Sequence, residues 1–481
     1  SSTAVQGLWG PLCLPTGATA RPSGRLQAVA FGLAALALGV VSATGSSCDA
    51  EGVCSTDDMG LLQAYQKARA FSREPRQMKL HLMEDKGLDS DVGAVCLDGS
   101  PGAFYFSGGV GADADNWLIF MEGGGWCTSA WDCYVARANA TWPTSLGSSK
   151  GYEEIGPEWM NKGINSLDCS VSPFCNYSQV FVRYCDGTSF SGNREDPALV
   201  LDTSSNALGK VYFRGQRIFD AMVDTLLTDF GLKFAKKVLF SGCSAGGLAA
   251  MLHADQLYDL LQSGAPKLEK YGTAPTSGFF LDVENAVQQD VYPSQLEQLF
   301  ALANWTTLYT QCAAAHPDTT AQCNFAPTAL KYIRSPIFLM NSALDWWQTR
   351  CVLADKLWNN GECLLLEGFE TCASNITACA GVELQAMNSY MDVFMKKIEG
   401  HTLSQKGNGA FIDGCHYHCE GNENEPFQTF EVDGVTMKDA LAKWWESDGE
   451  EAALHTYKEQ CRYGQGAECN PTCSIFVDPF R

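Results

Sequence analysis

The chain has 481 residues, of which 46% are apolar and 18% charged, so it can bury a large core, and disorder over most of its length is excluded. Its formal net charge of −22 would repel nucleic acid and the anionic cytoplasmic leaflet, which excludes both as expected partners. Its 21 cysteines form no C-x-x-C pair, so we expect disulfides made in an oxidising compartment rather than zinc sites.

Residues 1–46 are predicted to be a signal peptide with an upstream extension. Arg21 and Arg25 precede an apolar run over 28–41, and residues 41–43 resemble a small-residue cleavage site. The run is shorter than the roughly 20 residues that a membrane span needs. An uncleaved signal anchor is the alternative, and only then do we expect the protein at a membrane. Cleavage near Ala43 would remove one cysteine of the 21, Cys13, and leave an even number for pairing.

The remaining chain is predicted to hold one domain. Residues 47–77 are polar and mixed, and we interpret them as a lead-in segment. Residues 78–481 contain no internal repeat, no low-complexity tract and no long linker, so we expect a single domain there.

Three short apolar runs predict strands that are buried on both faces of a parallel sheet. They cover 116–121, 237–241 and 336–340, and each leads into a turn rich in glycine or ending in aspartate. Between them, amphipathic patterns predict helices over 214–230 and 247–261. Alternating strands and helices indicate an α/β fold, in which functional groups belong at the carboxyl ends of the strands.

The second strand leads into Gly242-Cys243-Ser244-Ala245-Gly246, which matches G-x-S-x-G. A strand before this motif and a helix after it are typical of a nucleophile elbow, in which Ser244 stands at the tip of a tight turn. An ordinary glycine-rich turn is the alternative. The glycines after the first strand, at 123–125, would supply backbone N–H groups to a developing oxyanion, with the N–H of Ala245 as partner. A nucleotide-binding turn is disfavoured because G-x-G-x-x-G and G-K-[ST] are missing.

A serine nucleophile needs an imidazole base, and in α/β-hydrolases the chain order is serine, acid, histidine. Asp345 ends the third strand and is the expected acid. Of the later histidines, His416 and His418 lie between Cys415 and Cys419, where disulfides could hold a base rigidly. Sequence reasoning alone leaves both open, and a Cys/His metal knuckle is the minor alternative.

Four N-x-[ST] tripeptides add to the prediction of a secreted glycoprotein. They begin at Asn139, Asn176, Asn304 and Asn375.

Several blocks of sequence resemble plant pectin acetylesterases, and more distantly the animal Notum carboxylesterases that remove a fatty acyl group from Wnt proteins. The resemblance runs from about residue 78 to 473 and is carried by the blocks 93–101, 122–127, 183–187, 213–215, 241–247 and 469–473. The block at 122–127 is closer to the plant form, as are Asp186 and Gly187.

The resemblance implies an α/β-hydrolase-like fold with a mostly parallel central sheet flanked by helices and held by disulfides. It implies Ser244 as nucleophile, Asp345 as orienting acid and His418 as base, because the family pattern C-x-x-H-C selects His418 over His416. It also implies an oxyanion hole made by Gly124, Gly125 and Ala245. We further expect Trp126 and Asp186, which lie in two of the matching blocks, to contact the substrate.

The leading hypothesis is therefore a secreted, monomeric carboxylic ester hydrolase of the extracellular space or cell wall. It would hydrolyse O-acetyl esters on a pectin-like polysaccharide, without a metal or other cofactor. A Notum-like enzyme that removes a fatty acyl group from a secreted protein is one alternative. An inactive homologue that only binds glycans is the other, and it belongs to a different functional class.

Overall fold

The computed structural model describes residues 76–139, 146–203, 206–359, 362–399, 405–449, 451–464 and 469–473. The predicted signal peptide and nearly all of the predicted lead-in segment lie outside these ranges. Every described residue belongs to one compact unit. No helix in the described ranges combines the length and the apolar character needed to cross a bilayer.

The described residues form a nine-stranded central sheet in the order β1-β2-β4-β3-β7-β8-β9-β12-β15. Its strands are β1 (Lys79–Leu82), β2 (Ala103–Ser107), β3 (Asn116–Met121), β4 (Ser178–Val182), β7 (Lys237–Cys243), β8 (Lys270–Thr276), β9 (Phe338–Ser342), β12 (Gly409–Asp413) and β15 (Thr456–Lys458). The pairs β1–β2 and β2–β4 are antiparallel, and every neighbouring pair from β4 to β15 is parallel. Three separate hairpins pair β5 (Ala198–Asp202) with β6 (Ala207–Val211), β10 (Asp355–Asn359) with β11 (Glu362–Leu365), and β13 (Glu431–Val432) with β14 (Val435–Thr436).

The α-helices of the described residues fall between these strands. They are α2 (Ala130–Asp132), α3 (Gly215–Thr228), α4 (Ala245–Leu252), α5 (Ala254–Gly264), α6 (Tyr292–Leu302), α7 (Thr310–Ala315), α8 (Ala326–Ala329), α9 (Trp346–Gln348), α10 (Gly381–Glu399), α11 (Asn424–Thr429) and α12 (Met437–Glu446). The three predicted strands correspond to β3, β7 and β9, and the helix predicted over 214–230 corresponds to α3.

The single helix predicted over 247–261 was wrong, because the chain divides there into α4 and α5 at His253. The His253 ring is fully buried and stacks on Phe219 with ring centroids 4.2 Å apart. Its two nitrogens hydrogen-bond with Ser191 and with Gln256. These contacts, which the local apolar pattern does not encode, hold a residue with φ −100° and ψ 3° between the two helices.

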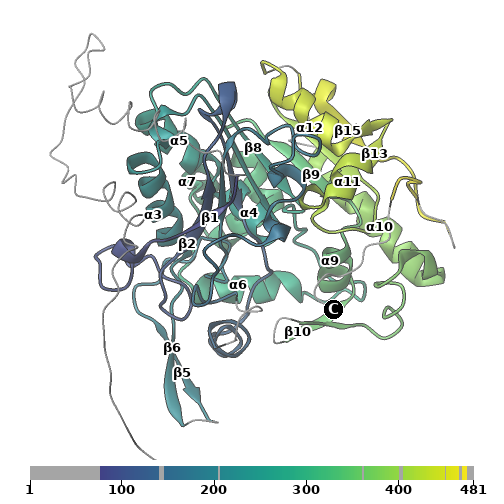
Figure 1. The fold of residues 1–481 in the computed structure, drawn as a ribbon. Coiled ribbons are helices and arrows are strands. Elements are labelled where there is room, and N and C mark those ends of the chain that lie inside the picture. The colour runs from purple at the N-terminus through teal and green to yellow at the C-terminus, as the bar shows by residue number, and fades with distance from the viewer. Residues whose placement is uncertain are drawn as a thin grey trace, which may run out of the picture. The chain divides into compact units, whose positions relative to one another are not determined.

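Alternating residues along the strands supply two cores, one on each face of the sheet. On β3, Trp117, Ile119 and Met121 belong to the larger core, with side chains of α3, α4 and α5, whereas Leu118 and Phe120 face the smaller core with α12. Figure 1 shows α3 and α5 on one side of the sheet and α12 on the other. The three layers leave the carboxyl ends of the parallel strands free to carry functional groups.

Nine disulfides pair every cysteine of the described ranges, whereas Cys13, Cys48 and Cys54 lie outside them. The pairs are Cys96–Cys185, Cys127–Cys133, Cys169–Cys175, Cys243–Cys419, Cys312–Cys323, Cys351–Cys363, Cys372–Cys379, Cys415–Cys473 and Cys461–Cys469. The two cysteines that flank the His416/His418 loop are joined to distant segments and not to each other. That loop is therefore held at both ends.

Candidate active site

Four segments meet at one edge of the sheet. The glycine loop follows β3, Ser244 follows β7, Asp345 follows β9, and the segment with His418 follows β12. These four strands run parallel within one sheet. Their carboxyl ends therefore lie at the same edge, as the sequence predicted.

Ser244 lies in a tight turn between β7 and α4, with φ 58° and ψ −126°, a conformation that side-chain-bearing residues seldom adopt. The turn depends on small neighbours. A Cβ added to Gly242 would lie 2.3 Å from the carbonyl oxygen of Gly246, and one added to Gly246 would lie 2.1 Å from that of Met121. The strained serine between crowded glycines has the geometry of a nucleophile elbow.

Asp345 and His418 form a hydrogen-bonded pair. The Nδ1–H of His418 donates to Oδ2 of Asp345 at 2.7 Å, while Oδ1 of the same carboxylate accepts the backbone N–H of Gln348 at 2.9 Å. Asp345 is fully buried, so both of its oxygens are held in place and the ring orientation follows from them. This assignment of the Nδ1 proton leaves Nε2 as the basic nitrogen of the ring.

Charges around the ring favour its protonated form. Burial lowers the pKa of His418, but the charge and hydrogen bond of Asp345 and the charge of Glu420 outweigh it, so the pKa lies above 6.5. Glu420 is itself buried, and its Oε2 accepts the hydroxyl of Ser277 at 2.7 Å. Burial and the charge of Asp345 raise the pKa of Glu420.

His416, the other histidine left open by the sequence, has a different environment. Its Nε2 hydrogen-bonds with the hydroxyl of Thr349 at 2.9 Å. Burial and the nearby charge of Arg350 lower its pKa to about 3, so it stays neutral. Of the two, it is His418 that hydrogen-bonds with Asp345.

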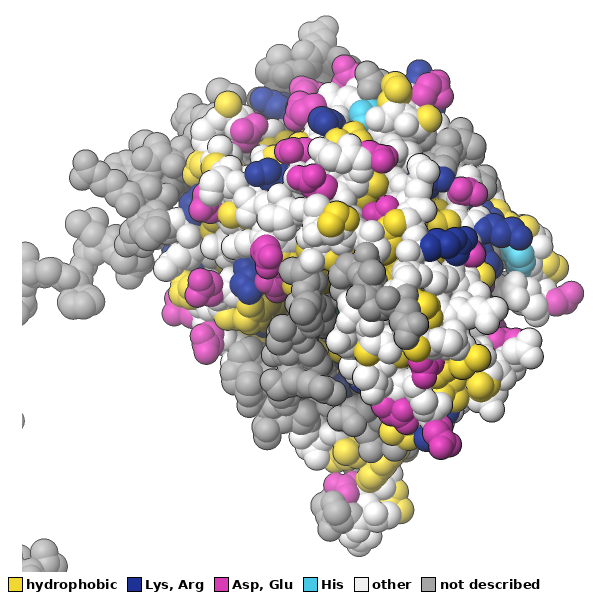
Figure 2. All heavy atoms as spheres, turned by 90° about the vertical axis from the view of Figure 1, so that its right-hand side faces the viewer, with side chains coloured by type: hydrophobic (Ala, Val, Ile, Leu, Met, Phe, Trp, Pro, Cys, Tyr) yellow, Lys and Arg dark blue, Asp and Glu magenta, His cyan; other side chains and the backbone are white. Residues whose placement is uncertain are grey.

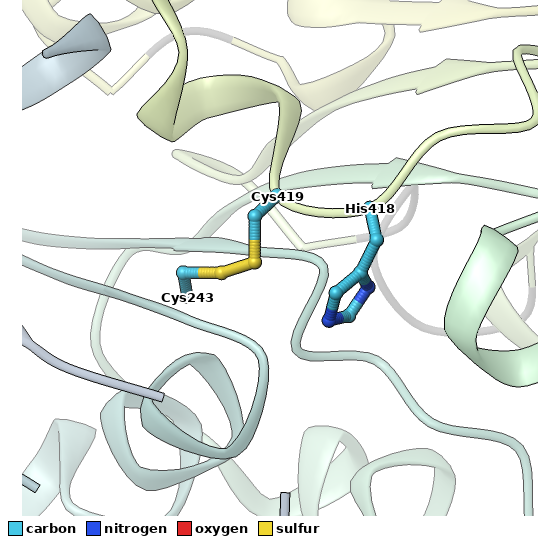
Figure 3. A group of neighbouring side chains, drawn as sticks. All are labelled: Cys243, His418 and Cys419. Atoms are coloured by element: carbon cyan, nitrogen blue, oxygen red, sulfur yellow. A yellow bond between two sulfur atoms is a disulfide. The ribbon is translucent and has the colours of Figure 1, made fainter. Parts of the chain in front are cut away.

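A disulfide connects the serine turn to the histidine loop. Cys243 precedes Ser244, Cys419 follows His418, and the two sulfurs are bonded to each other (Figure 3). Both sulfurs and a ring nitrogen of His418 lie within 4.8 Å of one another, so the imidazole lies beside the serine turn. Both cysteines are oxidised to the disulfide and so offer no thiolate to a metal ion. The same holds for the other three-ligand group of the described residues, which contains the Cys461–Cys469 disulfide.

Three backbone N–H groups are the candidates for an oxyanion hole. Gly124 and Gly125 have φ of 153° and 63°, values that glycine adopts without steric cost. The N–H groups of Gly124, Gly125 and Ala245 donate to none of the residues that the structure describes. Ala245 begins α4, where the first N–H groups of a helix have no partner within the helix. Backbone N–H groups of this kind are the donors that an oxyanion hole uses.

Trp126 and Asp186, which we expected to contact the substrate, are both fully buried. Oδ2 of Asp186 accepts hydrogen bonds from Thr188 and from the backbone N–H of Phe190, and burial raises its pKa to about 6. Direct contact of Asp186 with a substrate does not fit this burial, which indicates a structural role. Trp126 packs edge-on against the rings of Phe280 and Trp347, which lie beside His418.

The four candidate glycosylation sites lie at the surface to different degrees. Asn139, Asn304 and Asn375 are exposed, and Asn176 is half-buried.

Sequence reasoning missed three residues around the glycine loop. Glu122 accepts the Nε–H of Arg183 and the backbone N–H of Tyr184, both at 2.7 Å, while Arg137 and Tyr184 contact the loop carbonyls. Glu122 and Tyr184 lie in blocks that carry the family resemblance, which was the available signal. Arg137 lies in no such block, and nothing in its sequence neighbourhood marks it.

The fold places this site in a known structural class. The Wnt deacylase Notum from Drosophila superposes with a TM-score of 0.63 at 21% identity, covering 83% of this chain and all of that one. The chain has the α/β-hydrolase fold, with a mostly parallel sheet, flanking helices and disulfides, as predicted.

Sequence comparison then gives the family. The pectinacetylesterase family model matches residues 72–474. Pectin acetylesterase 7 of Arabidopsis thaliana is 32% identical over 79% of this chain and 89% of its own length. A palmitoleoyl-protein carboxylesterase, NOTUM of Schmidtea mediterranea, is 25% identical over 69% of this chain and 60% of its own length. The chain belongs to the pectinacetylesterase family and is a carboxylic ester hydrolase.

Proposed function

We propose that this protein is a secreted serine esterase that removes O-acetyl groups from an extracellular, pectin-like polysaccharide. The observation that carries the proposal is the 2.7 Å hydrogen bond between Asp345 and His418, on a loop joined by a disulfide to the serine turn. An imidazole oriented by a buried carboxylate is the base that a serine hydroxyl requires. The Arabidopsis relative named a pectin acetylesterase supports the choice of substrate.

In the first half-reaction, Nε2 of His418 takes the proton of the Ser244 hydroxyl as its oxygen attacks the acetyl carbonyl. Asp345 stabilises the imidazolium that forms. The N–H groups of Gly124, Gly125 and Ala245 donate to the developing oxyanion. When this intermediate collapses, the bond to the sugar oxygen breaks, the imidazolium returns its proton to that oxygen, and an acetyl group stays on Ser244.

In the second half-reaction, His418 deprotonates a water molecule that attacks the acetyl-serine. The second tetrahedral intermediate uses the same three donors. Its collapse releases acetic acid, which ionises in solution, and the proton on the imidazole returns to the Ser244 oxygen. His418 carries the transferred proton in both halves, and the attacking water supplies the proton that leaves with acetic acid.

Bulky aromatic side chains beside the imidazole support a short acyl group. Trp347 and Phe280 have ring centroids 6.5 Å from that of His418. Trp126 packs edge-on against both, with ring centroids 5.6 and 4.9 Å away. Close-packed rings leave little free volume between them, and an acetyl group needs less space than a fatty acyl chain.

The surface charge is compatible with a polyuronate substrate despite the net charge of −22. On the face drawn in Figure 2, acidic side chains are interspersed with lysine, arginine and uncharged groups. Mixed charges of this kind are screened over about 10 Å at ordinary ionic strength. Secretion is supported by nine disulfides and three exposed N-x-[ST] asparagines.

The proposal is tested by acetate release from acetylated pectin and from a neutral acetylated glycan. Ser244→Ala should abolish release while circular dichroism and Tm stay close to wild type, and the exposed Ser263→Ala serves as control. Full activity in Ser244→Ala would refute the serine mechanism. Release from the neutral glycan alone would refute the pectin-like substrate.

Two rival functions have their own tests. A series of aryl esters should give the highest kcat/KM at two carbons, and an optimum at eight or more would favour a Notum-like deacylase. A fluorophosphonate probe should label Ser244, whereas an inactive glycan-binding homologue would remain unlabelled.

A further inference from the structure

The carbonyl groups of the glycine loop are held from behind by two side chains. Nη2 of Arg137 donates to the carbonyl oxygen of Gly124 at 2.7 Å, and the hydroxyl of Tyr184 donates to that of Gly125 at 2.8 Å. Arg137 and Tyr184 are both buried. Neither has a part in the proton transfers proposed above.

Peptide geometry links these carbonyls to the oxyanion donors. In a planar trans peptide, the C=O of one residue and the N–H of the next point in opposite directions. The contact from Arg137 to the Gly124 carbonyl therefore fixes the direction of the Gly125 N–H. The contact from Tyr184 holds the following peptide, so Gly125 is restrained on both sides.

Such restraint is needed because glycine peptides rotate at low cost. Gly124 and Gly125 both have positive φ, and no side chain of their own limits them. A flip of the peptide between them would turn a carbonyl oxygen toward the developing oxyanion and replace attraction with repulsion.

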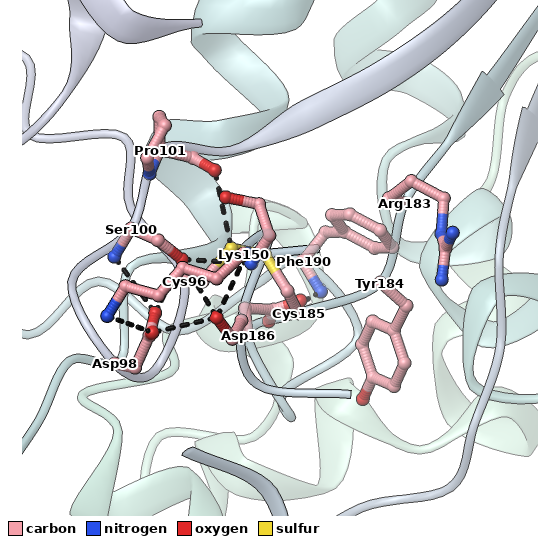
Figure 4. The surroundings of a disulfide bond; sticks show 12 residues. Cys96, Asp98, Ser100, Pro101, Lys150, Arg183, Tyr184, Cys185, Asp186 and Phe190 are labelled. Atoms are coloured by element: carbon pink, nitrogen blue, oxygen red, sulfur yellow. Dashed lines mark hydrogen bonds and ion pairs between the residues drawn. A yellow bond between two sulfur atoms is a disulfide. The ribbon is translucent and has the colours of Figure 1, made fainter. Parts of the chain in front are cut away.

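Disulfides anchor both segments that carry these side chains. Cys127, which follows Trp126, is bonded to Cys133 at the start of the short π-helix Cys133–Ala138 that contains Arg137. Cys185, which follows Tyr184, is bonded to Cys96, and Figure 4 shows Tyr184 beside this bond. Tyr184 is further held by the backbone N–H of Ser189, which donates to its hydroxyl at 3.1 Å.

We propose that Arg137 and Tyr184 are positioning residues that hold the amides of the glycine loop toward the reacting carbonyl. This inference rests on the proposed function, because it assigns these amides to the oxyanion hole. It also accounts for the buried charge of Arg137. Burial lowers the pKa of this guanidinium, and the nearby Tyr184, Asp132 and Asp186 offset only part of that shift.

The test compares two tyrosine variants on an aryl acetate. Tyr184→Phe removes the hydroxyl and should lower kcat about tenfold, the size of one lost hydrogen bond, with KM within about twofold. Tyr271→Phe is the control. Its buried hydroxyl donates to the carbonyl of Ala254 at 2.7 Å, but it lies at the start of β8, away from the strand ends that carry the site. Both variants should lose similar thermal stability, and only Tyr184→Phe should lose kcat.

A trifluoromethyl ketone, which forms an oxyanion on the serine, separates positioning from a general structural role. Tyr184→Phe should weaken its binding by the same factor as kcat/KM. Arg137→Lys, which keeps a donor, should retain more kcat than Arg137→Met. Wild-type kcat and inhibitor affinity in Tyr184→Phe, or equal losses in both tyrosine variants, would overturn the inference. Activity in Ser244→Ala would instead overturn the proposed function, so the two failures are distinct.

Discussion

The disulfide between Cys243 and Cys419 joins the residue before Ser244 to the residue after His418, across 176 positions of sequence. In the proposed mechanism, the hydroxyl and the imidazole must stay within hydrogen-bonding reach through two half-reactions. The bond connects their two backbone segments directly. It therefore bears on catalysis as well as on stability.

Replacing both cysteines, as Cys243→Ala with Cys419→Ala, should lower kcat by about a hundredfold, because small misplacements of reacting groups cost that much. KM should change little, since the substrate-binding surface remains. The control removes the Cys169–Cys175 disulfide, which precedes β4 at the opposite end of the sheet from the site. Steady-state kinetics with an aryl acetate measure kcat in the two variants. Equal values would show that the Cys243–Cys419 bond does not position Ser244 and His418.

Asp345→Asn should lower kcat by about ten thousandfold with a small effect on folding. The amide cannot stabilise the imidazolium as a carboxylate does. It can still accept the N–H of Gln348 and cap α9, so Tm should stay near that of wild type. Kinetics and thermal melts on the same preparation test the predicted loss of kcat and the predicted retention of Tm. A near-wild-type kcat would rule out Asp345 as the orienting acid.

Activity should fall as pH falls through the raised pKa of His418, because only the neutral imidazole can take the serine proton. Glu420 contributes to this pKa through its negative charge. Glu420→Gln should therefore lower the pKa of His418 and move the acid limb of kcat/KM to lower pH, with an unchanged alkaline plateau. Glu423→Gln, a half-buried neighbour paired with Lys162, is the control and should leave the limb in place. If the acid limb of the kcat/KM profile stays at the same pH in Glu420→Gln, this electrostatic account is contradicted.

Trp347→Ala should shift the acyl preference toward longer chains. Its ring lies beside His418 and is only partly buried, so its removal opens space at a moderate cost in stability. Two further buried methylene groups are worth about 1.6 kcal/mol, so the ratio of butyrate to acetate kcat/KM should rise by about tenfold. The exposed Trp131→Ala provides the comparison. An unchanged ratio in Trp347→Ala would place the acyl site elsewhere.

Much of the fold was predictable because buried parallel strands and their turns leave local patterns. The runs that became β3, β7 and β9 are apolar, and the glycines around Ser244 are required by close backbone approach in the turn. The division of α4 from α5 was not predictable, because His253 is held in part by Ser191 and Phe219, which are distant in sequence. Disulfide partners were beyond reach for the same reason, as Cys243–Cys419 shows.

The candidate site was predictable in part. Chain order and strand ends pointed to Ser244 and Asp345. The local sequence did not separate His416 from His418, because the two histidines differ in the residues that the fold places beside them. Arg137 was missed because its target is a backbone carbonyl, which carries no sequence signature.

The most direct measurement is the identification of the acyl-enzyme. The protein is mixed with an aryl acetate, quenched with acid during turnover, digested and examined by mass spectrometry. We expect one acetyl group on the peptide that contains Ser244, because the acid quench protonates His418 and stops deacylation. An acetyl group on a different residue, or turnover without any acetylated peptide in a time-resolved quench, would contradict the account.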